Sequence, residues 1–139
     1  LGVVAMLEAV NLVKTGNAPR IIQDESKATY ESWCSAEQAE IDWNKPANEI
    51  YNLIRGTDPA PGAWTLFNGD KLQVYAAQLL SAQQDHTPGM VTEITDEGIV
   101  VAAPGGQINI TRVRPAGGQK IAAPEFVATS GFSAGTQLG

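Results

Sequence analysis

The 139-residue chain contains one cysteine and one histidine, which excludes several kinds of site. Cys34 has no second cysteine, so neither an internal disulfide bond nor a cysteine zinc site can form, and we interpret it as a spectator thiol in a reducing compartment. His86 lies in a polar run that ends at Pro88 and Gly89. We expect an exposed loop histidine, because one histidine without nearby partners builds neither a metal site nor a catalytic pair.

Basic residues are also scarce, at 9 against 15 acidic residues, which gives a net charge of −6. This balance argues against general binding of polyanions, since phosphate contacts require clustered lysine and arginine. The apolar run over residues 1–13 has no basic start and is interrupted by polar residues, so we expect neither a secretory signal nor a membrane span, and a cytoplasmic location. The chain begins without methionine, and we expect it to be a fragment of a longer protein.

The stretch Ile41–Thr65 carries the clearest local signals. We predict a helix with Asn44 or Lys45 as N-cap, Pro46 in its first turn and Gly56 as a left-handed C-cap. Its apolar face is formed at helical spacing by Ala47, Ile50, Tyr51 and Ile54. Two prolines in the following loop forbid further helix, so the chain leaves it as a strand.

Short strand-like runs dominate the rest of the sequence. They are Ala63–Phe67, Lys71–Ala77, Met90–Thr95, Gly98–Ala103 and Gln107–Val113. Asn68 and Gly69 predict a tight hairpin turn between the first two runs, and Leu79–His86 is expected to end the second and begin a loop. We predict a mainly β, α+β domain, a small closed or partly open barrel of five to six strands with one inserted helix. Pro124–Ala128 is expected to form one helical turn, and the tail Thr129–Gly139 to pack loosely or fray.

The N-terminal part has a different character. The stretch Leu1–Thr15 predicts a helix that ends at Gly16. This helix would be apolar around most of its circumference, so burying it requires more partner surface than a small barrel supplies. We therefore expect residues 1–16 to be the last helix of a preceding domain, residues 17–40 a linker, and residues 41–139 the barrel domain. The linker's expected anchors are Ile21, Ile22, Tyr30 and Trp33. The alternative is that Leu1–Thr15 is a buried helix of a self-contained fold. If the helix instead belongs to a preceding domain that is absent here, we expect it to self-associate or to be disordered.

The segment IDWNKPANEIYNLIRG, followed by PGAWT, resembles the C-terminal domain of the 10-formyltetrahydrofolate-dependent formyltransferases. APRIIQDESKATYE is similar to that family's linker, and PGMVTEITDEGIVVA to its barrel strands. The resemblance implies an OB-like barrel, an N-terminal formyltransferase domain in the same protein and 10-formyltetrahydrofolate as formyl donor. The family's catalytic Asn, His and Asp belong to the N-terminal domain, and its His-x-Ser-x-Leu-Pro motif is not found here. The resemblance therefore implies an accessory domain without catalytic residues or a bound cofactor, which shapes the cleft and orients the acceptor.

Two subfamilies share these motifs. Ala28–Glu31, Arg55–Asp58 and Pro61–Thr65 resemble the hydrolase domain of 10-formyltetrahydrofolate dehydrogenase, and we take that type as the main interpretation. The ending Gly135–Gly139 is similar to methionyl-tRNA formyltransferase, which is the alternative. The sugar-nucleotide formyltransferases also belong to this family, so water, methionyl-tRNA and an amino sugar all remain as formyl acceptors.

One group of basic residues stands out against the overall negative charge. Arg112 and Arg114 alternate at strand spacing and should share a face, with Lys120 a few residues on. These residues predict either an RNA-contacting surface or contacts within the protein, the arginines pairing with Glu93, Glu97 or the interdomain surface. A free-standing RNA-binding barrel is a further alternative, although only 6% of the chain is aromatic.

Overall fold

The computed structural model describes residues 2–81 and 86–139. The chain divides into two compact units, Leu1–Ser32 and Trp33–Gly139. The first unit contains the helix α1 (Gly2–Lys14) and the short 3-10 helix η1 (Glu25–Lys27). Gly16 ends α1 in the left-handed conformation, as predicted, and its N–H donates to the carbonyl of Val13. No helix within the described ranges is long and apolar enough to cross a membrane.

The described side chains of this first unit are exposed throughout. None of the residues described in α1 is buried, and the apolar Val3 and Val13 are 76% and 69% exposed. The expected linker anchors Ile21, Ile22 and Tyr30 are also exposed. Their burial against a neighbouring domain stays a prediction.

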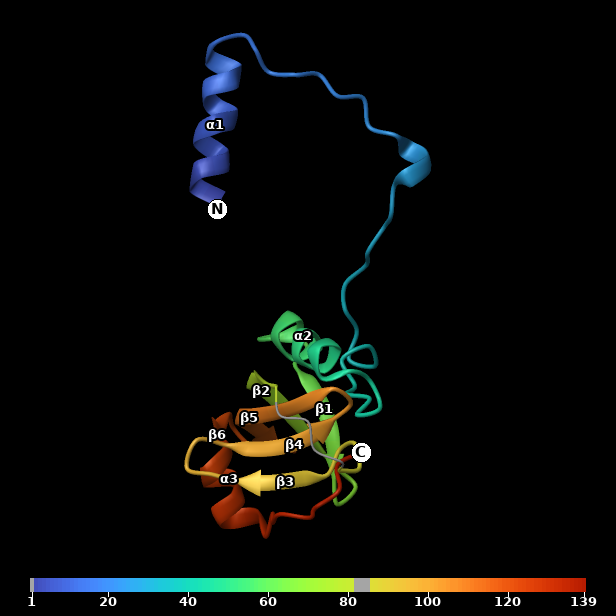
Figure 1. The fold of residues 1–139 in the computed structure, drawn as a ribbon, viewed down its shortest axis with the longest axis vertical. Helices are drawn as coiled ribbons and strands as arrows, with labels where there is room; N and C mark the ends of the chain where they lie inside the picture. Colours follow the sequence, from blue (N-terminus) through green and yellow to red (C-terminus); the bar gives the residue numbers. More distant parts are fainter. Residues whose placement is uncertain (1, 82–85) are drawn as a thin grey trace. The chain divides into compact units, whose positions relative to one another are not determined.

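The second unit is built around one antiparallel sheet (Figure 1). Its strands are β1 (Ala63–Phe67), β2 (Asp70–Leu80), β3 (Val91–Ile94), β4 (Ile99–Ala103), β5 (Gly106–Pro115) and β6 (Ile121–Ala122). They lie in the order β1-β2-β5-β4-β3, and β6 pairs with β5. The mainly β, α+β prediction is confirmed, and the arrangement is compatible with an OB-like barrel. The part of the predicted loop that falls on residues 82–85 lies outside the described residues.

The hairpin between β1 and β2 forms where Asn68 and Gly69 predicted it. Both residues have positive φ angles, 53° and 84°, and Phe67 pairs directly with Asp70 across the turn. Asparagine and glycine tolerate this left-handed region better than other residues, which makes the turn tight. The pairing register of β1 and β2 follows from this turn.

The C-terminal tail closes the sheet, so the prediction that it packs loosely or frays is wrong. The tail follows α3 (Ala123–Ser130), which is longer than the single predicted turn. The Val91 N–H on β3 donates to the carbonyl of Thr136, and the Gly139 N–H donates to the carbonyl of Leu66 on β1. Leu138 is buried among the core side chains. The tail therefore bridges the two edge strands.

Gly89 makes this closure sterically possible. Its φ angle is +82°, and a Cβ atom at this position would lie 2.7 Å from the carbonyl oxygen of Leu138. The Leu138 N–H in turn donates to the Gly89 carbonyl at 3.0 Å. Glycine at position 89 thus lets the tail approach the start of β3 closely.

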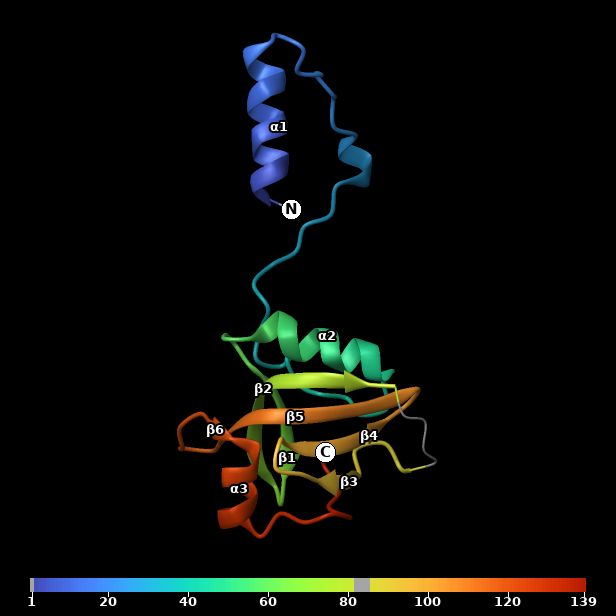
Figure 2. The ribbon, with the colours of Figure 1, turned by 60° about the vertical axis from the view of Figure 1, so that its left-hand side comes forward.

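The helix α2 (Ala47–Thr57) lies across β2 and β5 (Figure 2). Ala47, Ile50 and Ile54 are buried in the core, as the apolar spacing predicted, whereas Tyr51 is half-buried at its margin. The core also contains Trp43, whose indole N–H donates to the hydroxyl of the buried Thr65 at 2.9 Å. The segment before α2 is therefore fixed to β1 by a buried hydrogen bond.

Both predicted caps of this helix are wrong. The N-cap is Pro46, in an extended conformation with no side-chain capping bond, and the Ala47 N–H donates instead to the carbonyl of Pro104. Gly56 lies inside the last helical turn, and the helix ends at the C-cap Asp58. Asp58 precedes Pro59, and proline disfavours helical geometry in the residue before it. The end of α2 is thus set by proline and not by a left-handed glycine.

The position of Gly56 gives a direct test. Replacing Gly56 with alanine is expected to raise the free energy of unfolding by about 0.5 kcal/mol, because alanine loses less backbone entropy in a helix. A methyl group added to Gly56 would have no neighbouring atom within 4 Å, so no clash offsets the gain. Urea denaturation of both chains measures the difference. A loss of about 1 kcal/mol would instead indicate a left-handed C-cap.

Candidate functional site

The predicted basic residues of β5 lie on one face of the sheet. Arg114 pairs in register with Gln73, and Arg112 with Ala76, on the neighbouring strand β2. Val113, between the two arginines, is fully buried and faces the core, whereas both arginine side chains are exposed. Alternation along the strand therefore directs two guanidinium groups to solvent together.

Neither arginine is neutralised by a carboxylate of the described residues. Among residues 2–81 and 86–139, ion pairs join Lys27 with Asp24 and Lys120 with Asp58. The alternative that Arg112 and Arg114 pair with Glu93 or Glu97 is therefore not realised. Arg114 Nε donates to the carbonyl of Gly118 at 3.1 Å, which anchors this side chain to the loop that follows β5.

Lys120 makes two contacts that the sequence did not predict. Its Nζ atom is 3.4 Å from Asp58 Oδ1 and 3.4 Å from the ring centroid of the buried Tyr75. An ammonium group over an aromatic face is stabilised by the negative potential of the ring. Lys120 therefore fastens the β5–β6 loop to the loop after α2, and its charge is partly offset by Asp58.

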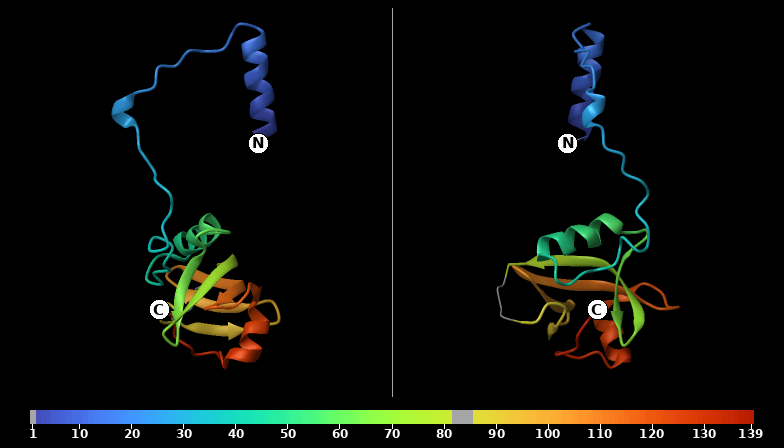
Figure 3. Two further views of the ribbon diagram at one scale, coloured as in Figure 1. Left: turned by 180° about the vertical axis from the view of Figure 1, so that it is seen from behind. Right: turned by 90° about the vertical axis from the view of Figure 1, so that its right-hand side faces the viewer.

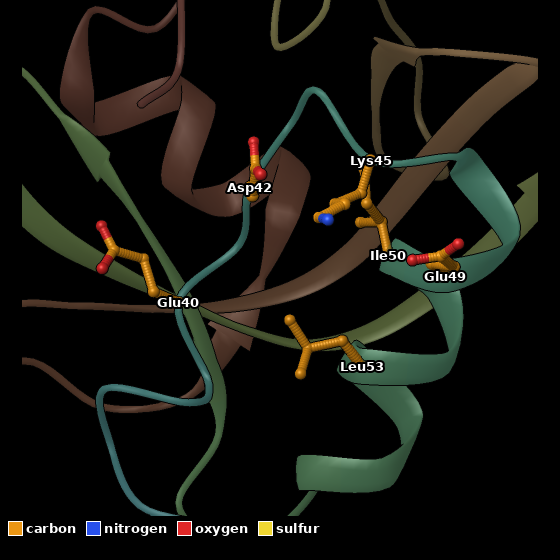
Figure 4. Close-up of a pocket in the computed structure, with 6 residues that line it drawn as sticks. All are labelled: Glu40, Asp42, Lys45, Glu49, Ile50 and Leu53. Atoms are coloured by element: carbon orange, nitrogen blue, oxygen red, sulfur yellow. The ribbon is translucent and has the colours of Figure 1, made fainter.

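A second feature is a hollow beside α2 with a volume of about 270 Å³ (Figure 4). Its lining residues are Glu40, Asp42, Lys45, Glu49, Ile50 and Leu53. Hydrogen bonds from the backbone and side-chain amides of Asn44 lower the pKa of Asp42 below its ordinary value. The hollow thus combines an apolar wall with an excess of negative charge, which is the opposite character to the arginine face.

The remaining titratable candidates from the sequence are Cys34 and His86. Cys34 is exposed and forms no disulfide with the described residues, and His86 is exposed as well. Across residues 2–81 and 86–139, no group of three or more His, Cys, Asp or Glu side chains is placed to hold a metal ion. The exposed guanidinium groups of the arginine face suit phosphate groups.

Two bacterial enzymes that share one name are similar in sequence to this chain. Methionyl-tRNA formyltransferase of Bacillus velezensis is 40% identical over 139 residues, which cover 99% of this chain and 44% of the relative. The enzyme of the same name from Moorella thermoacetica is 39% identical over 117 residues, covering 84% of this chain and 38% of the relative. The chain thus spans less than half the length of these curated relatives.

Solved structures show the same fold at lower sequence identity. A variant of HypX from Aquifex aeolicus superposes with a TM-score of 0.63 at 20% identity, over 89% of this chain and 23% of HypX. HypX in complex with tetrahydrofolic acid gives a TM-score of 0.62 at 19% identity, over 88% of this chain and 22% of HypX. At this level of identity the likeness concerns the fold alone.

The family model described as "Formyl transferase, C-terminal domain" matches residues 34–131. This range contains the helix α2 and all six strands of the sheet. The chain belongs to the formyl transferase C-terminal domain family.

Proposed function

We propose that this chain is the tRNA-contacting C-terminal domain of an enzyme that transfers a formyl group from 10-formyltetrahydrofolate to methionyl-tRNA. The observation that carries the proposal is the exposed pair Arg112 and Arg114, which share one face of β5 without a carboxylate partner among the described residues. Guanidinium groups with free donors suit the phosphates of an RNA backbone. The names of the curated relatives support this acceptor better than the dehydrogenase-type hydrolase that the local motifs favoured.

The overall charge does not oppose this role, because the acidic and basic residues are separated on the domain. Residues 38–139 contain 6 basic and 10 acidic residues, but residues 100–139 contain 3 basic and 1 acidic residue. The arginines lie on β5, while Glu40, Asp42 and Glu49 line the hollow beside α2. A weakly basic face of this kind positions RNA and leaves most of the affinity to other parts of the enzyme.

The chemistry of formyl transfer belongs, in this proposal, to a preceding domain. That domain would supply the catalytic Asn, His and Asp and bind the folate, while the barrel shapes one wall of the cleft and orients the acceptor. Residues 1–16 would be the last helix of the catalytic domain, residues 17–40 the linker, and the barrel would follow. The exposed apolar side chains of α1, including Val3, Met6 and Val13, are consistent with a helix that packs against such a domain. Separated from it, the same helix is expected to self-associate or to be disordered.

Binding of tRNA to the complete enzyme tests the proposal. Replacing Arg112 and Arg114 with alanine is expected to weaken tRNA binding about tenfold at physiological salt, since two exposed contacts of roughly 0.7 kcal/mol each are lost. Fluorescence anisotropy with labelled methionyl-tRNA measures the dissociation constant. The rate of formyl transfer at saturating tRNA should stay within about twofold of the unmodified enzyme, because neither arginine contacts the reacting groups.

A matched control separates local contacts from net charge. The double variant Lys45→Ala and Arg55→Ala removes the same charge from exposed positions before and on α2. It should leave tRNA affinity within about twofold of the unmodified enzyme, because it removes no contact of the arginine face. Equal weakening by both double variants would overturn the assignment of the tRNA contact to β5.

A further inference from the structure

The β5–β6 loop, residues 116–120, follows directly on the strand that carries the two arginines. It contains Gly117 and Gly118, and Gly117 has a φ angle of +69°. The Gly118 N–H donates to the carbonyl of Pro115 at 3.0 Å, which closes a turn after β5. Two successive glycines allow many backbone conformations, so the position of this loop depends on its contacts with the rest of the domain.

Lys120, at the end of this loop, lies on the same face of the sheet as the arginines. Val113 on β5 pairs with Ile121 on β6. Val113 is buried in the core and Ile121 packs against it, so both side chains face the core. Because successive side chains alternate along a strand, the neighbouring residues Arg114 and Lys120 lie together on the opposite face.

Two contacts hold the Lys120 side chain across this face. Its Nζ atom lies 3.4 Å from the ring centroid of the buried Tyr75 on β2 and 3.4 Å from Asp58 Oδ1 in the loop after α2. The β5–β6 loop and the loop after α2 lie at the same end of the sheet (Figure 3). A phosphate that approached the Lys120 ammonium would also approach the negative charge of Asp58, and like charges repel. Lys120 is therefore better placed to hold the loop than to bind RNA directly.

The same loop sets the orientation of the Arg114 guanidinium group. Arg114 Nε donates to the Gly118 carbonyl at 3.1 Å, while the side chain stays exposed. A guanidinium group has five N–H donors, so this bond leaves the four on its two terminal nitrogens for other acceptors. Two such donors in parallel bind a phosphate bidentately. The contact with Gly118 therefore fixes Arg114 in one orientation for a phosphate contact.

We propose that Lys120 is a positioning residue for the RNA contact on β5. By holding the β5–β6 loop against Tyr75 and Asp58, Lys120 keeps the Gly118 carbonyl in place. That carbonyl orients Arg114 toward a phosphate of the RNA backbone, and Lys120 itself does not touch the phosphate. This inference rests on the proposed RNA contact and adds to it the residue that orients one of its two arginines.

A double-mutant cycle on the complete enzyme tests the inference. Lys120→Met keeps the aliphatic stem and removes the ammonium group, and it should weaken binding of methionyl-tRNA about twofold to threefold, the size of one exposed charged contact. In the Arg114→Ala enzyme the same change should alter the affinity by less than about 1.3-fold, because no guanidinium group remains there to be oriented. In the Arg112→Ala enzyme it should keep its full effect. Fluorescence anisotropy measures all these affinities.

Two further lysine variants separate the contact from the charge. Lys120→Arg keeps a cation that lies over the Tyr75 ring and pairs with Asp58, so it should retain tRNA affinity within about 1.3-fold. Lys45→Met makes the same substitution as Lys120→Met at an exposed position before α2. It should leave the affinity unchanged within the same range, because no contact of the arginine face depends on it.

Tyr75 gives a test that changes no charge. Its side chain is only 4% exposed, so it is not itself a contact for RNA. Tyr75→Leu removes the aromatic face under Lys120 and should weaken tRNA binding about twofold when Arg114 is present and less than about 1.3-fold when it is alanine. Tyr75→Phe keeps the ring and should retain the affinity. If Tyr75→Leu does not fold, the Lys120 variants decide the question alone.

The orientation of Arg114 is also measurable without RNA. In the 139-residue chain, NMR follows the exchange of the Arg114 Nε–H proton with water. Lys120→Met should speed this exchange at least about threefold, because the hydrogen bond to Gly118 opens more often. Lys120→Arg should keep the slow exchange, and the Nε–H of Arg112 provides the internal reference. An unchanged exchange rate of Arg114 in Lys120→Met would show that Lys120 does not position this side chain.

The binding results separate this inference from the RNA contact itself. Equal weakening by Lys120→Met with and without Arg114 would mean that Lys120 contacts the phosphate directly, which would overturn the positioning role. An unchanged affinity for Lys120→Met, with weakening by Arg114→Ala retained, would also overturn that role and leave the RNA contact standing. An affinity that is insensitive to both Arg112→Ala and Arg114→Ala would overturn the RNA contact, and the role of Lys120 in it would fall as well.

Discussion

Replacing Trp43 with alanine is expected to lower the free energy of unfolding of the 139-residue chain by about 4 kcal/mol. Trp43 is only 4% exposed and belongs to the core that α2 shares with the sheet. Its removal leaves a large cavity, and it also deprives the hydroxyl of Thr65, which is 1% exposed, of its hydrogen-bond donor. Chemical denaturation followed by tryptophan fluorescence and by circular dichroism measures the loss.

Two further variants divide this effect into its parts. Trp43→Phe keeps most of the apolar volume but removes the indole N–H, so it should cost about 1–2 kcal/mol. Trp33→Ala removes a side chain that is 96% exposed and should change stability by less than about 0.5 kcal/mol. Similar losses for Trp33→Ala and Trp43→Ala would contradict the placement of Trp43 in the core.

Replacing Leu138 with aspartate is expected to abolish the cooperative folding of the unit Trp33–Gly139. Leu138 is 2% exposed, next to the last residue of the tail that bridges β3 and β1. A carboxylate there would lose its hydration without gaining a cationic partner, and the bridging hydrogen bonds would be lost with the packing. The milder change Leu138→Ala should cost about 2–4 kcal/mol.

Ala134→Asp provides the control for this experiment. It introduces the same charge into the same tail at an exposed position. Its denaturation midpoint should stay close to that of the unmodified chain, because no buried group changes. An unchanged midpoint for Leu138→Asp would show that the tail does not close the sheet.

The contrast between α2 and the tail shows which features the sequence predicts. The apolar residues Ala47, Ile50 and Ile54 recur at helical spacing, and Asn68 with Gly69 has a strong turn preference, so both patterns are local and were predicted correctly. In the tail, many Gly, Ser and Thr residues suggested weak packing, although Phe132 and Leu138 are buried. Their burial depends on strands far away in the sequence, which no local pattern reveals.

The candidate site likewise has features that local sequence patterns predicted and features that they did not. Strand alternation predicted that Arg112 and Arg114 share a face, and the structure shows both exposed on either side of the buried Val113. The contact of Lys120 with Asp58 joins residues 62 positions apart, so spacing along the chain could not predict it. The rings of Phe67 and Phe126 likewise lie 5.8 Å apart between centroids, and no sequence motif links these two residues.

The salt dependence of tRNA binding by the complete enzyme tests the central claim most directly. A plot of log affinity against log salt concentration should become shallower by about 1.4–1.8 when Arg112 and Arg114 are both replaced with alanine, because each lost phosphate contact removes about 0.7–0.9 from the slope. The Lys45→Ala and Arg55→Ala control should retain the original slope. If the arginine variant also retained the original slope, neither arginine would contact the RNA backbone, and the account of this domain as a tRNA-contacting barrel would be contradicted.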